Sequence, residues 1–246
     1  MVTHNLVQSG IRRLPNARAA RPAPLNNSLA LEVLGTARCL QLRPQIEAFE
    51  SHVFGPDFAV GNAEMDNWTK SGSWCCAAVV GQAVVGRQQV FSILSLLVTT
   101  AASRDALLAG EISEAELQPW TQSPPSEKPV LYLASVISAA REHLASLYES
   151  LASDLLQFRD AWDADFASGF SIASGPAGLS HMARNGFRVI DGPQYRDRYP
   201  IMLIDRQSAE TEFWQDVFSD VRHPGYEEHG VETAISPLFS SVALAS

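Results

Sequence analysis

The stretch SHMARNGFRVI, residues 180–190, combines the last turns of a helix, a stop and the start of a strand. Gly186 follows the last helical turn, where glycine readily adopts the left-handed conformation that ends a helix. The segment before it, PAGLSHMAR at 176–184, has Pro176 early, which suits the first turn of a helix. From Phe187 the residues have strand composition. The stretch therefore predicts a helix that stops at Gly186 and leads into a strand.

The elements on either side predict an alternation of strands and helices. PVLYLASVIS (129–138) has strong β composition, and AAREHLASLYESLASDLLQF (139–158) is the longest clear helix. A strand is expected within DADFASGFSIAS (163–174), another at YPIMLID (199–205), and an amphipathic helix at 208–221. The long helix has one apolar stripe with spacings of three and four: Leu144, Leu147, Tyr148, Leu151 and Leu155.

The first half of the chain predicts a meander of strands. A strand is expected at 31–34 and a helix at 43–55, whose Ile46, Phe49 and Val53 share one face. Residues 73–100 are small and β-branched and predict two or three strands with both faces buried, a turn near Gly81–Gln82 and a last strand at Val90–Val98. Residues 101–128 predict a helical insertion, since Ser113 and Glu116 form a capping box.

Composition and charge describe a globular protein with an acidic body. The 246 residues carry a net charge of −9. Residues 1–30 contain four arginines and no acid, so setting their +4 apart leaves −13 for the rest. A body this acidic repels a phosphate backbone, and we expect no nucleic-acid partner. We expect a disordered basic arm at 1–30, a single domain at 31–220 with its insertion at 101–128, and an irregular tail at 221–246.

The cysteines and the apolar runs bear on compartment. Cys39, Cys75 and Cys76 include no CxxC pair, so neither a disulfide framework nor a zinc site is predicted. The longest apolar run has about 13 residues, fewer than the roughly 20 that a membrane-spanning helix needs. We expect reduced thiols in a cytoplasmic protein, with import into an organelle through the basic arm as the alternative. A homodimer is compatible with these features.

In this order the elements resemble the GCN5-related N-acetyltransferase (GNAT) superfamily. The resemblance spans about residues 31–206 and is carried by LYLASVISAAREHLASLYESL and then GLSHMARNGFRVIDG. It implies an α/β (α+β) fold with a mixed, mainly antiparallel twisted sheet and helices on both faces. It also implies acetyl-CoA or another acyl-CoA as co-substrate, a small-molecule amine or amino-acid-like acceptor, and no metal.

The resemblance also implies where the coenzyme would bind. The pantetheine arm would pair with the strand edge near Ser135–Ser138, and the pyrophosphate would meet N–H groups at the start of the following helix. The implied coenzyme-binding residues are Val136, Ile137, Ser138, Arg141, Glu142, His143, Leu144, Ala145 and Ser146. The family loop is roughly Arg/Gln-x-x-Gly-x-Gly/Ala, and aligning it on Arg141 puts Leu144 and Ser146 in the two glycine slots. Leu144 would crowd the phosphate and Glu142 would repel it.

The catalytic positions depart from the family pattern as well. Many members place a tyrosine four residues before the glycine of Gly-Phe, where this chain has Met182, which cannot donate a proton. His181 is the candidate acid, but one residue along a helix is a rotation of about 100°, so a solvated histidine is the alternative. Ser135 and Tyr132 are candidates to line the site, with buried packing as the alternative, and Tyr148 is expected in the core.

Three functions follow from these residues. The first is an acyl-CoA-dependent N-acyltransferase in which an amine attacks the thioester directly, without a covalent enzyme intermediate. The second is an enzyme like the acyl-homoserine lactone and N-acyl amino acid synthases, which use long acyl chains. The third is a non-catalytic binding protein with the same fold, which the filled glycine slots and Met182 favour. The acidic run at Asp160–Asp165 lacks the glycine that a calcium loop needs and reads as a solvated turn.

Overall fold

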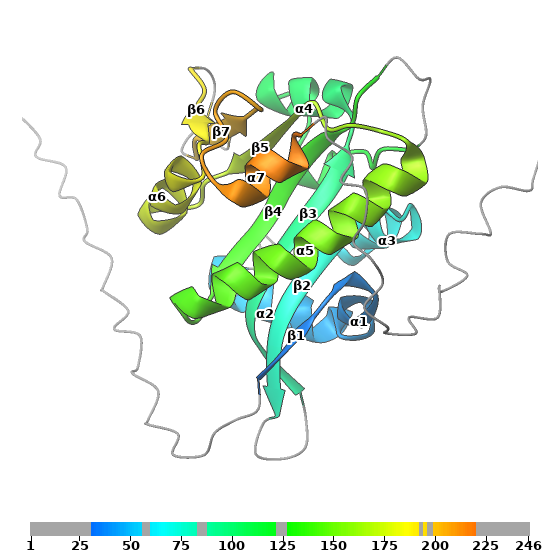
Figure 1. The fold of residues 1–246 in the computed structure, drawn as a ribbon, viewed down its shortest axis with the longest axis vertical. Helices are drawn as coiled ribbons and strands as arrows, with labels where there is room; N and C mark the ends of the chain where they lie inside the picture. The colour runs from blue at the N-terminus through cyan, green and yellow to red at the C-terminus, as the bar shows by residue number, and fades with distance from the viewer. Residues whose placement is uncertain are drawn as a thin grey trace, which may run out of the picture.

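The computed structural model describes residues 31–55, 60–82, 88–121, 127–191, 194–195 and 199–219. It contains a seven-stranded sheet of order β1-β2-β3-β4-β5-β7-β6, in which each neighbouring pair is antiparallel except β4 and β5, which run parallel. The predicted sheet, mixed and mainly antiparallel, is therefore confirmed (Figure 1). The strands are β1 (Leu31–Leu34), β2 (Trp74–Gln82), β3 (Gln88–Thr99), β4 (Val130–Ser138), β5 (Ser168–Ile172), β6 (Arg188–Val189) and β7 (Ile201–Ile204).

Helices cover both faces of the sheet. Helices α5, α6 and α7 pack on one face, and α1 to α4 pack on the other. In Figure 1 the long α5 crosses the front of the central strands, with α1 and α2 behind them. The helices are α1 (Thr36–Gln41), α2 (Arg43–Phe54), α3 (Asn62–Lys70), α4 (Ala101–Leu108), the short 3₁₀ helix η1 (Glu114–Glu116), α5 (Arg141–Trp162), α6 (Pro176–Arg184) and α7 (Glu212–Val217).

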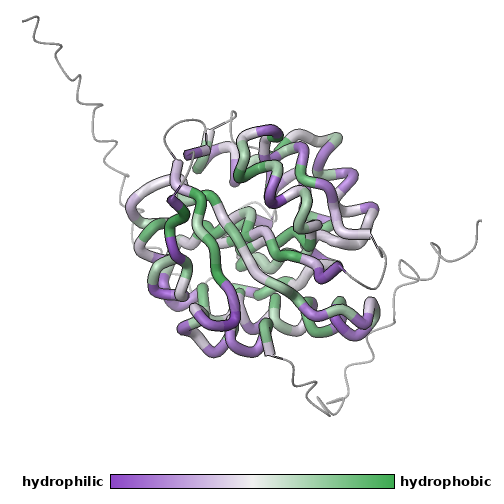
Figure 2. The backbone as a smooth tube through the Cα atoms, turned by 90° about the horizontal axis from the view of Figure 1, so that it is seen from above, coloured by the Kyte–Doolittle hydropathy of each residue, from purple (hydrophilic) through white to green (hydrophobic). Residues whose placement is uncertain are grey.

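Strand β2 shows why the sheet is apolar on both faces. Successive side chains of a strand point to opposite faces. Cys75, Ala77 and Val79 accordingly belong to the core beneath α5, whereas Cys76 and Ala78 belong to the core on the α1–α4 side. Both faces are buried, as the composition predicts, and the view from above in Figure 2 shows apolar segments through the middle of the molecule. The three cysteines are buried free thiols.

Several expectations about the first half of the chain need correction. The turn expected near Gly81–Gln82 is wrong, because both residues belong to β2, which pairs with β3 up to Gln82↔Gln88. Helix α1 was not predicted, since its six residues are too few to show a clear period. On α2, Ile46 is buried and Phe49 packs against the core as predicted, whereas Val53 is exposed and Glu50 is buried, so the predicted face is wrong at Val53 alone.

The opening stretch has the predicted structure. Helix α6 ends at Arg184 and Gly186 has φ +97°, a conformation that favours glycine. Phe187 is buried and packs edge-on against Trp214 of α7, with ring centroids 5.2 Å apart. The short strand β6 follows at Arg188. The expected basic arm at 1–30 and the whole of the expected tail at 221–246 lie outside the described residues.

Candidate functional site

The parallel pair β4 and β5 separates halfway along its length. The two strands pair from Val130↔Ser168 to Leu133↔Ser171, but β4 continues to Ser138. The register with β3 shifts between Ser95 and Leu96, so β4 contributes an extra residue at Ala134. Such a bulge bends a strand and increases its twist. Beyond Leu133, no strand that the structure describes pairs with the β5-facing edge of β4.

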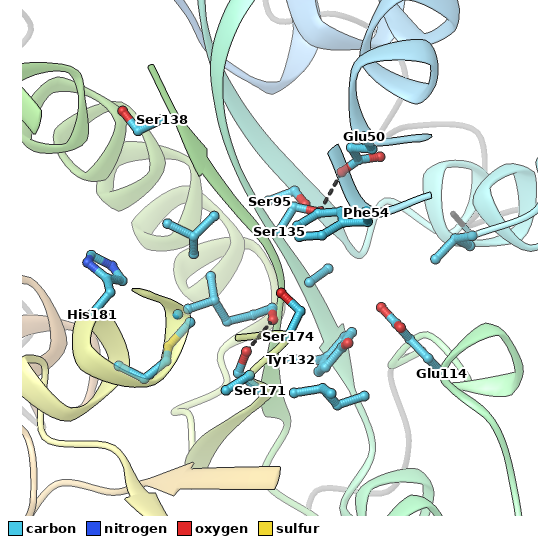
Figure 3. A pocket seen from close by; sticks show the side chains of 18 of the residues that line it. Glu50, Phe54, Ser95, Glu114, Tyr132, Ser135, Ser138, Ser171, Ser174 and His181 are labelled. Carbon is cyan, nitrogen blue, oxygen red and sulfur yellow. Dashed lines mark hydrogen bonds between the residues drawn. The ribbon is translucent and has the colours of Figure 1, made fainter. Parts of the chain in front are cut away.

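A cavity of about 260 Å³ occupies this opening and passes from one face of the sheet to the other (Figure 3). Its walls between the two ends come from Ser95 of β3, from β4 and from residues 171–174. We call the end on the α2–α3 side the acceptor half; it is lined by Glu50, Phe54, Val60, Met65, Trp68 and Glu114. We call the end on the α5–α6 side the donor half; it is lined by Leu144, Ala177, Gly178, His181, Met182 and Arg184.

Glu50 brings a carboxylate into the acceptor half. Its side chain is only 8% exposed, and Oε1 accepts a hydrogen bond of 2.5 Å from the hydroxyl of Ser135 on β4. The second oxygen, Oε2, accepts no hydrogen bond from the described residues. Burial raises the pKa of Glu50, the hydrogen bond from Ser135 lowers it, and the nearby Glu47 raises it. The result is a carboxyl group with a raised pKa beside the unpaired edge of β4.

The phenol of Tyr132 lies close enough to both glutamates of the acceptor half to interact with them. Its ring is buried and packs against Phe170, with centroids 4.9 Å apart. Burial raises the pKa of its phenol well above the ordinary value, and the carboxylates of Glu114, which accepts a hydrogen bond from it, and of Glu50 raise it further. Tyr132 therefore remains a neutral phenol, and it is not a base.

In the donor half, His181 is held by a hydrogen-bond network. Its Nε2 lies 2.9 Å from the hydroxyl of Tyr148 on α5 and 3.5 Å from Nδ2 of Asn185. Nδ2 of Asn185 also donates to the backbone carbonyl of His181 at 2.9 Å, and because a carbonyl can only accept, Nδ2 is the amide nitrogen and can only donate. We therefore assign Nε2 as an acceptor, Tyr148 as a donor and the imidazole hydrogen to Nδ1. Nδ1 has no hydrogen-bond partner among the described residues.

The charge state of His181 agrees with this assignment. Burial lowers its pKa, and the positive charge of Arg184 lowers it further. The imidazole is therefore neutral at neutral pH, a donor of a hydrogen bond from Nδ1 rather than a strong acid. The alternative of a solvated helix histidine is wrong, because His181 is half-buried, bonds Tyr148 and lines the cavity together with Met182. Tyr148 is partly buried at the edge of the core, and its hydroxyl serves this network.

The nine residues implied to bind coenzyme A have different surroundings. Val136, Ser138 and Leu144 line the cavity, whereas Ile137 packs into the core on the opposite face. Positions 141 to 146 form the first turns of α5 and not a loop, and Arg141, Glu142 and Ala145 are exposed. Ser146 is half-buried and does not line the cavity.

The connection between β4 and α5 is braced by polar side chains. The hydroxyl of Ser92 lies 2.8 Å from Nδ1 of His143 and 3.2 Å from the hydroxyl of Ser138, and it accepts a bond from the N–H of Ala139. His143 is therefore positioned by the strand behind it. Ala140 caps α5 without a side-chain hydrogen bond, which leaves N–H groups of the first turn for solvent or a ligand. The residues present fit a thioester arm along β4 better than they fit a glycine-rich phosphate loop.

The structure brings together two residues that the sequence singled out and adds one that it did not. Ser135 and His181 line the same cavity, in its middle and in its donor half. Glu50 was missed because its partner Ser135 is 85 residues away in the chain. The one signal in the sequence was that Glu50 comes four residues after Ile46 and so lies on the same face of α2. A glutamate at that position looks the same in the sequence whether it is buried or exposed.

Two other site types are not found in the described part of the chain. It holds no group of three His, Cys, Asp or Glu side chains placed to bind a metal ion. None of its helices combines the length and the apolar character needed to cross a membrane.

The comparisons with known proteins concern the fold. No protein-family model and no curated protein matches the sequence. Among solved structures, a GNAT-family acetyltransferase from Staphylococcus aureus Mu50 is 10% identical, with 72% of this chain and 99% of that chain covered and a TM-score of 0.39. FeeM, an N-acyl amino acid synthase from uncultured soil microbes, is 12% identical, with 74% and 97% covered and a TM-score of 0.44. AtaT, complexed with acetyl-methionyl-tRNAfMet, is 12% identical, with 73% and 96% covered and a TM-score of 0.37. These TM-scores are below 0.5, so activity is inferred from the cavity alone.

Proposed function

We propose that the protein is an N-acyltransferase that moves an acyl group from a coenzyme A thioester to a primary amine. The observation that carries the proposal is the pairing of Ser135 with the buried Glu50 at the unpaired edge of β4. A thioester arm that pairs with this edge would enter from the donor half. Its acyl carbon would then lie near Ser135, within reach of an amine that enters from the acceptor half.

The residues of the cavity divide the chemistry between them. Glu50 accepts one proton from the incoming ammonium, and its raised pKa brings it closer to the pKa of an amine. The neutral nitrogen attacks the acyl carbon, so that a C–N bond forms and the C–S bond breaks. Unpaired N–H groups on the β4 edge stabilise the negative charge that develops on the acyl oxygen.

The donor half serves the leaving group. The Nδ1–H of His181 donates a hydrogen bond to the departing thiolate, and Tyr148 holds the imidazole in the tautomer that makes this possible. The second proton of the nitrogen passes to the thiolate, which completes the amide and the free thiol. N–H groups at the start of α5 and the guanidinium of Arg141 are the groups available to the phosphates of the donor.

The first experiment measures donor binding and turnover separately. Acyl-coenzyme A thioesters of increasing chain length are screened by thermal shift, because a ligand that binds the folded state raises the melting temperature. Release of free thiol is then followed with a panel of primary amines, and the acylated amine is identified by mass. Binding of a thioester with amine-dependent thiol release is the expected result. A protein that binds no thioester in this screen, and by calorimetry, would have a different function.

A non-catalytic protein with this fold remains the second candidate, favoured by the side chain of Leu144 in the donor half. It predicts no release of thiol with any amine. Acyl-pantetheine is an informative control donor, because it lacks the diphosphate. If the arm along β4 supplies most of the binding, acyl-pantetheine is bound nearly as well as acyl-coenzyme A.

A further inference from the structure

We infer that the acceptor is a small primary amine carried on an apolar chain or ring, without a carboxylate or other acidic group. This inference rests on the proposed function and adds the substrate class. It is carried by the composition of the acceptor half. Four of its six side chains are apolar, and the other two are glutamates.

The apolar side chains give the acceptor half its shape. They are Phe54, which ends α2, Val60, which precedes α3, and Met65 and Trp68 on α3. Trp68 is fully buried, and its indole N–H is already used in a bond to the carbonyl of Leu117, so its ring offers an apolar surface. A ring or short alkyl chain can be buried here, and burying it contributes about 25 cal/mol per Å² of apolar area.

The amine end of such an acceptor is matched by Glu50. Glu50 as a residue is only 8% exposed, and its Oε2 accepts no hydrogen bond from the described residues. An ammonium group can donate to Oε2 while it lies near the ring of Phe54, which lies beside Glu50 in Figure 3. Such an arrangement pairs a buried anion with the cationic form of the substrate.

The same arrangement excludes an acidic acceptor. The one Lys or Arg among the described residues that line the cavity is Arg184, on α6 in the donor half. A carboxylate next to the amine, as in an amino acid, would lose its hydration shell beside the carboxylate of Glu50. Among the described residues, no cation lines the acceptor half to compensate for this loss or for the repulsion between the two anions. An amino acid is therefore the wrong acceptor for this cavity, although the sequence alone left that class open.

Size narrows the class further. The whole cavity has a volume of about 260 Å³ and has to hold the thioester end of the donor as well. Drug-sized ligands occupy cavities of about 300–1,000 Å³. The acceptor is accordingly a single ring or a short chain with one reactive amine, and not a macromolecular side chain that fills a wide groove.

The test compares acceptors that differ only in a carboxylate. Thiol release from acetyl-coenzyme A is measured with 2-phenylethylamine against phenylalanine and with pentylamine against norleucine. We expect the amine of each pair to have a kcat/KM about 100-fold or more above that of its amino acid, because of the unpaired buried anion. Comparable values within both pairs would overturn this inference and leave the acyltransferase proposal intact. If thiol is released with none of these four compounds and with no other amine, both this inference and the acyltransferase proposal are overturned.

Two lysine variants make the comparison sharper. Val60→Lys adds a cation to the acceptor half at a half-buried position, and it should reduce the preference for 2-phenylethylamine over phenylalanine at least tenfold. Ala177→Lys adds the same charge to an exposed position in the donor half and should leave that preference unchanged. An equal effect of both lysines would show that the discrimination does not arise in the acceptor half, and the inference would fall.

A binding measurement keeps the inference testable without turnover. In a thermal-shift titration of the wild-type protein, 2-phenylethylamine should raise the melting temperature at concentrations where phenylalanine does not. A rise with phenylalanine equal to that with the amine would contradict the inference. The same titration with Val60→Lys should show a smaller difference between the two ligands.

Discussion

Gly186, the helix stop in the stretch SHMARNGFRVI, should not tolerate a side chain. Its φ is +97°, and a Cβ atom built there would lie 1.8 Å from the carbonyl oxygen of Ser208 and 2.9 Å from the nitrogen of Glu210. Both atoms belong to backbone, so no side-chain rotation can relieve the overlap. Gly178, in the middle of α6, is the matched control, because a Cβ there meets nothing within 4 Å.

The two glycines predict opposite effects of the same substitution. In Gly186→Ala, the positive φ costs about 1 to 2 kcal/mol, and moving the backbone of Ser208 away costs about 1 to 3 kcal/mol. The free energy of unfolding should fall by about 2 to 5 kcal/mol, and the melting temperature by about 4 to 20 °C. In Gly178→Ala, the helix propensity of alanine should raise the free energy of unfolding by up to about 1 kcal/mol.

Urea unfolding followed by circular dichroism measures both variants. The reasoning is refuted if Gly186→Ala unfolds at the same urea concentration as the wild type, or if both substitutions shift the midpoint in the same direction. The substitution of Gly186 should also affect the donor half of the cavity. Asn185, which precedes Gly186, contacts His181 and accepts a hydrogen bond from the N–H of Glu210, so a displaced chain here disturbs the donor half.

Four further predictions concern the cavity. Glu50→Gln should lower kcat by about 10²- to 10⁴-fold in a thiol-release assay, the usual contribution of a general base; near-normal turnover would remove Glu50 from that role. Because burial raises the pKa of Glu50, the folded protein binds its proton more tightly than the unfolded chain, so this contribution to stability is present below about pH 4.3 and is lost as pH rises through the folded pKa. Urea unfolding at a series of pH values from about 4.3 upward should therefore show that the free energy of unfolding of Glu50→Gln rises relative to that of the wild type. If the difference in free energy between the two proteins does not change with pH, the pKa of Glu50 is not raised. Ser135→Ala removes a hydrogen bond that lowers the pKa of Glu50, so the acid limb of the pH–rate profile should move to higher pH; a loss of rate with an unmoved profile would mean that Ser135 acts on packing alone. Leu144→Gly should tighten acyl-coenzyme A binding in calorimetry at a cost of about 1 kcal/mol in stability, and unchanged binding would favour the non-catalytic candidate.

Much of the fold could be predicted because its long elements follow strict periods. The apolar stripe of α5 and the β-branched run of β2 and β3 identify these elements from their own residues. The structure confirms all three elements. The short elements could not be found in the same way. Helix α1 has six residues, and α3 carries only Met65 and Trp68 as large apolar side chains, so tertiary contacts decide their conformation.

The candidate site was less predictable, because its residues meet only in three dimensions. The position of Ser135 on the coenzyme strand could be inferred from the order of elements. Its bond to Glu50 could not, since nothing local marks a glutamate as buried. His181 could be named as a candidate, but helix rotation alone also favoured a solvated position for it, whereas the cavity at α6 is lined by both His181 and Met182.

The divergence of β4 from β5 also has a consequence for self-association. An unpaired strand edge is a template on which another chain can add a strand, and proteins that expose one tend to aggregate. Here the bare edge beyond Leu133 faces a cavity closed by α6 on one side and by α2 and α3 on the other. The helices that would guide the substrates therefore also keep the sheet from extending into a neighbouring molecule, and loosening α6 would expose the protein to that risk.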